Sequence, residues 1–98
     1  AIGGILGPRI SELNTVTRID SYVDVATSIT FNIEERAAIG SAGVDILSSD
    51  QVATITGASE SSSFNNSSLA NGNWLYLDIS GKDGTPTLLV VTLTCSVG

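Results

Sequence analysis

Acidic side chains are the residues of this sequence whose spacing comes closest to a catalytic pattern, because the chain contains no histidine. Two carboxyl groups flanking a glycosidic bond can hydrolyse it, one as general acid and the other as base or nucleophile. The neighbouring carboxylate pairs are Glu34 with Glu35, Asp20 with Asp24, and Asp45 with Asp50. Glu34 and Glu35 point to opposite faces if they lie in one strand, and the other two pairs are spaced like solvated loop residues. We therefore predict that the protein is not an enzyme.

The other motifs for catalysis or cofactor binding are missing from the sequence. Without histidine, a Ser-His-Asp or Cys-His site and most zinc or iron sites are excluded. The segments GGILG and GKDGT lack the spacing of phosphate-binding loops. The single cysteine, Cys95, excludes an internal disulfide. We expect Cys95 to be a small buried hydrophobic residue, with a disulfide between two copies as the alternative. The prediction is no metal and no cofactor.

Three aromatic residues form the remaining candidate site. Trp74 and Tyr76 are two residues apart in an expected strand, so their side chains should share one face. Exposed aromatic rings on a β-sheet can stack on sugar rings, and Tyr22 is a further candidate for such a platform. The alternative is that this face packs on a neighbouring subunit or under the N-terminal segment, with the polar tips at the rim.

Charge and hydropathy exclude two classes of partner. The formal net charge is -6, and the basic residues Arg9, Arg18, Arg36 and Lys82 are scattered singly. No basic stripe is available for nucleic acid or for an anionic membrane surface. No apolar run approaches the roughly 18 residues of a membrane span. Charged residues make up 14% of the chain, against the usual share of about 25%, which suits permanent packing against neighbours. We expect no signal peptide and synthesis in a reducing cytoplasm.

Alternation of apolar and polar residues with period two dominates the pattern and indicates β-strands. TSITFNIEE places Ile29, Phe31 and Ile33 on one face. TVTRIDSYV alternates less cleanly, but its β-branched residues favour a strand. With turn signals between the strands and no βαβ alternation, the sequence predicts an all-β, antiparallel β-sandwich, jelly-roll-like, of about six or seven short strands. A strand around Ser62 to Phe64 is favoured, and a short helix over residues 34–39 is a less favoured alternative to a loop.

The segment from Asn71 to Thr94 holds two strongly apolar runs, NWLYLDIS and TLLVVTLT, around the insert GKDGTP. The glycines and the proline of the insert are a strong turn signal. We therefore predict an antiparallel hairpin of central strands. Because the second run is apolar on both faces, its second face requires a partner.

The first residues, AIGGILGP, mix apolar residues with three glycines, which make an isolated element costly to order. We predict an extended N-terminal arm over residues 1–14, ahead of a sandwich domain over 15–98. Its apolar and proline side chains would dock on another subunit; they are Ile2, Ile5, Leu6 and Pro8. The alternative is a disordered terminus.

From about Thr15 onward the chain resembles small β-sandwich structural proteins of tailed bacteriophages. The similar features are TRIDSYVDVATSITFNIEER, a Ser/Asn-rich middle, and LANGNWLYLDIS followed by GTPTLLVVTLT. The resemblance implies a virion component on the capsid exterior. It would be a head decoration (cement) protein that bridges major capsid protein subunits, and it would act as a homo-oligomer, with a trimer favoured.

Two other functions remain open. One is a carbohydrate- or receptor-binding module of a phage head or tail fibre, which would use Trp74, Tyr76 and Tyr22. The other is a subunit of a cellular surface layer or pilus, against which the expected lack of an export signal argues.

Overall fold

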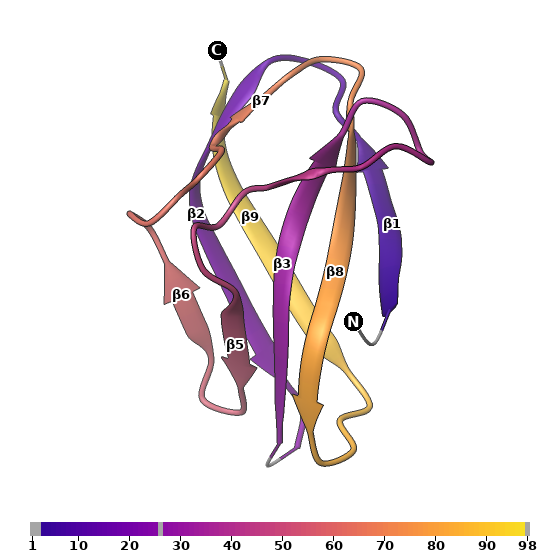
Figure 1. The fold of residues 1–98 in the computed structure, drawn as a ribbon. Coiled ribbons are helices and arrows are strands. Elements are labelled where there is room, and N and C mark those ends of the chain that lie inside the picture. Colours follow the sequence, from indigo (N-terminus) through magenta and orange to yellow (C-terminus); the bar gives the residue numbers. More distant parts are fainter. Residues whose placement is uncertain (1–2, 26, 98) are drawn as a thin grey trace.

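The computed structural model describes residues 3–25 and 27–97, which form two antiparallel sheets packed face to face (Figure 1). This confirms the predicted all-β antiparallel sandwich. The described residues contain nine strands and no helix. The strands are β1 (Gly3–Arg9), β2 (Asn14–Val23), β3 (Ser28–Arg36), β4 (Val44–Asp45), β5 (Gln51–Thr54), β6 (Ala58–Glu60), β7 (Ser68–Leu69), β8 (Trp74–Asp83) and β9 (Leu89–Val97).

The first sheet has the order β1-β8-β3, and the short strands β4 and β5 both pair with the remaining edge of β3. In the second sheet β2 is central, with β9 along one edge and β6 and β7 along the other. The chain passes from the first sheet to the second between β5 and β6, through a turn in which Gly57 has a φ of 88°. That crossover links the sheets on the side where β5 and β6 lie.

Strands β3 and β2 supply the centre of the core. Ile29, Phe31 and Ile33 are all buried, as the alternation in β3 predicts. In β2 the register shifts between Val16 and Arg18, which marks a β-bulge. The bulge adds one residue to the strand, so that Val16 and Ile19 are both buried although they are three residues apart. This is why the alternation of β2 looked irregular in the sequence.

The predicted hairpin between residues 71 and 94 is wrong. Strand β8 lies in the middle of the first sheet and pairs with β1 and β3, whereas β9 pairs with β2 in the second sheet. The turn between them contains Gly84, with a φ of 77°, and it carries the chain across the sandwich. The two apolar runs therefore face each other across the core rather than lying side by side.

Three smaller predictions also change. Residues 34–36 belong to β3, and no helix follows them in residues 37–39. The strand expected around Ser62 to Phe64 is reduced to a single bridge between Phe64 and Leu47, while the actual strand there is β6. Cys95 was expected to be buried, but it is exposed near the end of β9.

Two buried polar side chains connect elements of the sandwich. Gln51 of β5 accepts a hydrogen bond from the Ser21 hydroxyl at 2.7 Å and donates one to the Ile19 carbonyl at 3.2 Å. Since Ser21 and Ile19 belong to β2, this side chain joins the two sheets. Asn32 of β3 makes hydrogen bonds to Leu47 and Asp50, which lie in the segment between β4 and β5.

Candidate functional site

The outer face of the first sheet carries the predicted aromatic pair. Trp74 and Tyr76 are both half-buried on β8. Trp74 lies in register with Arg9 of β1 and with Arg36 of β3. The Arg9 guanidinium is 6.0 Å from the centre of the Trp74 ring, and the Arg36 guanidinium is 3.6 Å from the centre of the Tyr76 ring. Cation–π contacts of this kind hold arginine and aromatic groups together. Three neighbouring strands therefore build one aromatic–arginine cluster, formed by Arg9, Arg36, Trp74 and Tyr76.

The surroundings of Tyr76 and Arg36 fix this cluster in place. Glu34 accepts hydrogen bonds from the Arg36 guanidinium, with an N–O distance of 2.9 Å in the ion pair. Gly4 lies under the Tyr76 ring, and a Cβ atom at that position would come within 2.1 Å of the Tyr76 hydroxyl oxygen. Arg36 already covers the Tyr76 ring from one side, so the larger open aromatic surface of the cluster belongs to Trp74.

Tyr22 does not join this cluster. It lies on β2 in the second sheet, opposite Val90 of β9 in the strand register. Tyr22, Leu88 and Val90 are 42%, 51% and 43% exposed. Alternate residues of β9 share a face, so Val90 lies on the outer side of the strand, and Leu88 immediately precedes the strand. The second sheet therefore has its own exposed apolar group, and the prediction that Tyr22 joins Trp74 and Tyr76 in one platform is wrong.

The described part of the expected arm is an edge strand of the sandwich. Residues Gly3–Arg9 form β1, which pairs antiparallel with β8 of the same chain. Ile5 and Leu6 are 61% and 40% exposed, while Ile2 lies outside the described residues. Docking of this segment on another subunit stays a prediction, and the exposed side chains available for it are Ile5, Leu6 and Pro8.

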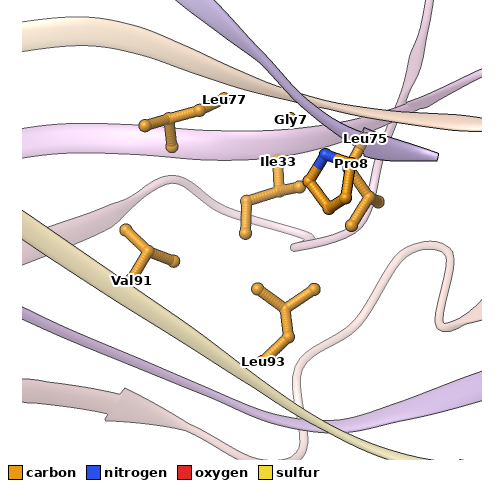
Figure 2. A pocket seen from close by; sticks show the side chains of 7 residues that line it. All are labelled: Gly7, Pro8, Ile33, Leu75, Leu77, Val91 and Leu93. Atoms are coloured by element: carbon orange, nitrogen blue, oxygen red, sulfur yellow. The ribbon is translucent and has the colours of Figure 1, made fainter. Parts of the chain in front are cut away.

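The sandwich is incompletely closed on the side opposite the β5–β6 crossover. There an apolar pocket of about 130 Å³ opens between β1, β8 and β9. Figure 2 shows the lining side chains converging from both sheets; they are Gly7, Pro8, Ile33, Leu75, Leu77, Val91 and Leu93. Leu75, Leu77, Val91 and Leu93 pack against the core but remain only half-buried. We call this feature the open edge.

The candidate carboxylates hold loops in place. Glu35 accepts hydrogen bonds from the Asn66 and Asn73 side chains and from the Ala70 N–H, at 2.8 to 2.9 Å. Asp24 accepts bonds from the Thr87 hydroxyl and N–H and from the Leu88 N–H, and these bonds lower its pKa.

The other candidate carboxylates are placed as follows. Asp20 pairs with Arg18, at 2.9 Å, and this contact lowers the pKa of Asp20. Asp50 accepts a hydrogen bond from the Ser80 hydroxyl at 2.6 Å. Burial and the nearby carboxylates of Glu34 and Asp50 raise the pKa of Asp45. Within residues 3–25 and 27–97, no group of three or more acidic or cysteine side chains is arranged to hold a metal ion.

Sequence reasoning missed Arg9, Arg36 and Gly4 as parts of the aromatic cluster, and it missed the open edge. Each depends on which strands are neighbours, and period-two alternation does not specify neighbours. A conspicuous signal was nevertheless present. Gly4 lies in a run that is short of side chains, as a strand packed under a large ring requires.

Comparisons with known proteins give no relative for this architecture. The chain matches no family model, no curated protein and no solved structure. Among the described residues, no helix is long and apolar enough to cross a membrane.

Proposed function

We propose that this protein is a non-catalytic structural protein that works by binding to neighbouring subunits of a larger assembly. Following the resemblance drawn from its sequence, we propose that the assembly is a phage head. The protein would be a capsid decoration (cement) protein that bridges major capsid protein subunits.

The observation that carries this proposal is the exposure of large apolar side chains on an otherwise weakly charged surface. Ile5 is 61% exposed on β1, Leu88 is 51% exposed just before β9, and Val90 is 43% exposed at the start of β9. Val90 lies opposite Tyr22 on the second sheet, and exposed apolar side chains gathered in this way are typical of protein–protein contacts. The engagement of Glu35 and Asp24 in loop contacts also favours a structural role over a catalytic one.

A pelleting assay with capsids that lack this protein tests the proposal. Ile5→Asp should lower the affinity for such capsids at least about tenfold, because a fully buried isoleucine contributes about 1.5–3 kcal/mol and each 1.4 kcal/mol is a factor of ten. Ile55→Asp is the matched control, since Ile55 is 47% exposed in the turn after β5. Failure of the unmodified protein to pellet with any phage capsid would exclude the cement role.

The aromatic–arginine cluster supports a second candidate, a carbohydrate-binding module. Trp74 offers an aromatic surface beside the Arg9 guanidinium, and such a pair suits a sugar that carries a carboxylate. Trp74→Ala should abolish binding on a glycan array while the circular dichroism spectrum stays unchanged. Tyr22→Ala, which alters the other sheet, should leave binding intact. Unfolding of Trp74→Ala would assign Trp74 to the structural framework and remove this candidate.

A further inference from the structure

Strand β9 is the one long edge of the described sandwich without protection against pairing. Natural sheets shield edge strands with charges, prolines, bulges or short length, because an open row of N–H and C=O groups recruits other strands. The edge strand β1 contains Pro8 and an irregularity between Leu6 and Arg9. Strands β4 and β7 have two residues each, β5 has four, and β6 has three and ends on Glu60. By contrast, β9 runs for nine residues without a charge or a proline.

The distribution of charge identifies what kind of strand suits this edge. The chain carries a net charge of -6, so two copies repel each other over most of their surfaces. Residues 84–98 contain no charged side chain, and neither do residues 1–8. Along the open edge, β9 therefore carries no charge, and β1 carries none before Arg9 at its end. A second copy of the same chain can approach there with the least repulsion.

We propose that β9 pairs antiparallel with β9 of a second copy, around a two-fold axis at Leu93. Leu93 is the middle residue of Leu89–Val97, so this register pairs the full strand. An antiparallel pair of identical strands is self-complementary, as a two-fold interface requires. The second sheets of the two copies become one continuous sheet.

This pairing also covers the open edges. A two-fold axis perpendicular to the sheet keeps the inner face of each copy on the same side. The inner row of β9 is then extended by the inner row of the other copy. Within one chain this row becomes steadily less covered, from the half-buried Leu89, Val91 and Leu93 to the exposed Cys95 and Val97. With the axis at Leu93, Cys95 lies opposite Val91 of the second copy, and Val97 lies opposite Leu89. The uncovered end of the row thus meets the covered end.

The inference deepens the proposed function and rests on it, because it names one neighbour within the assembly. It favours a two-fold dimer over the trimer implied by the resemblance. Light scattering should give a mass of twice the 10.1 kDa of one chain. The measurement uses about 0.1 mM protein, because this concentration exceeds the dissociation constant expected for an interface of standard size. A monomer or a trimer under these conditions would overturn it.

Two lysine substitutions at neighbouring positions test the interface itself. Cys95→Lys places a charge in the inner row that the second copy covers, and it should weaken the dimer at least about tenfold, because an ammonium group resists desolvation. Thr94→Lys places the same charge on the outer row, where it stays in solvent, and should change the dimer affinity less than about threefold. Both residues are exposed in the single chain, so neither change should unfold it. Equal effects of the two substitutions would exclude the edge pairing.

A cysteine placed at the axis tests the register. Leu93→Cys combined with Cys95→Ser should form disulfide-linked dimers on oxidation, since opposing residues of antiparallel strands have Cα atoms about 4.5–5.5 Å apart. The natural Cys95 residues would lie about 14 Å apart along the strand direction and should not link. Linkage through Cys95 alone would contradict the axis at Leu93. A dimer that does not bind capsids would contradict the cement role but not the β9 pairing. A monomer that binds capsids would contradict the β9 pairing but not the cement role.

Discussion

Removal of the buried Asn32 side chain should strongly destabilise the sandwich. Asn32 is 3% exposed. Its Oδ1 accepts hydrogen bonds from the N–H groups of Ile33, at 2.9 Å, and Leu47, at 3.1 Å. Its Nδ2 donates to the Leu47 carbonyl, at 3.2 Å, and to the Asp50 carboxylate, at 3.0 Å. One side chain therefore fixes the segment between β4 and β5 against β3.

The cost of Asn32→Ala follows from the groups left without partners. Leu47 is 2% exposed, so water cannot readily replace the bonds to its N–H and carbonyl groups. Each buried unsatisfied group costs about 1–3 kcal/mol, and two such groups give about 2–6 kcal/mol. Domains of this size have a total stability of about 5–15 kcal/mol. Since 1 kcal/mol shifts the melting temperature by about 4–8 °C, the melting temperature should fall by at least about 8 °C.

Urea unfolding followed by tryptophan fluorescence measures this change in the free energy of unfolding. Asn71→Ala, at an exposed position, is the matched control and should change the stability by less than about 0.5 kcal/mol. If Asn32→Ala is no more destabilising than this control, the hydrogen bonds of Asn32 do not stabilise the fold and the reasoning is refuted.

Asn32→Asp keeps the shape of the side chain but removes the Nδ2 donor that bonds Leu47 and Asp50. It therefore tests the contribution of these hydrogen bonds to stability apart from that of packing. The new carboxyl group would keep the two N–H bonds at Oδ1, which lower its pKa, but its burial, the Leu47 carbonyl and the Asp50 carboxylate should together outweigh them and raise its pKa in the folded state. A raised folded-state pKa gives stability that is present below the unfolded value of about 3.9 and is lost as the pH rises through the folded value. The variant should therefore come closer to the unmodified protein in acid than at pH 7. An identical stability difference at both pH values would contradict this assignment.

Three further predictions concern other contacts. Gly4→Ala should cost about 1–3 kcal/mol by displacing Tyr76, and a double-mutant cycle with Tyr76→Ala should show that most of this cost disappears when the ring is absent. Gln51→Ala should cost about 1–3 kcal/mol in urea unfolding, because the buried partners of Gln51 in the opposite sheet lose their bonds. Because hydrogen bonds from Thr87 lower the pKa of Asp24, its stabilisation is present above the unfolded value and is lost as the pH falls through the folded value. Asp24→Asn should therefore flatten the acid limb of the stability curve, as measured by thermal unfolding across pH.

The sequence allowed the strands and their buried faces to be predicted where one face alone is apolar. Ile29, Phe31 and Ile33 point toward the core, because the residues that alternate with them are polar and only one face of the strand is apolar. The faces of β2 were not predicted, since a bulge after Val16 changes the phase of the strand. The strand β1 was not predicted, because its three glycines leave no alternation of apolar and polar side chains in the sequence.

Strand partners were harder to predict than strand faces. Adjacent apolar runs suggested a hairpin, but the turn at Gly84 crosses between the sheets. For the same reason the sequence predicted that Trp74 and Tyr76 share a face, but it did not predict their arginine neighbours. Arg9 and Arg36 reach the cluster from strands that are distant in the sequence.

Strands β8 and β9 pair with different neighbours, so they do not form the single ribbon with two apolar faces that the sequence suggested. The need for a partner must therefore be judged for each strand separately. The inner rows of both strands pack against the core of the same chain. On β8, the Tyr76 side chain lies against Arg36 and Gly4, so that face is partly covered within the chain. Leu88, just before β9, and Val90 on β9 are 51% and 43% exposed, and one edge of β9 has no partner strand among the described residues. Exposed apolar side chains and a free strand edge therefore coincide at β9, which is the one long edge of the described sandwich that carries no protection against pairing.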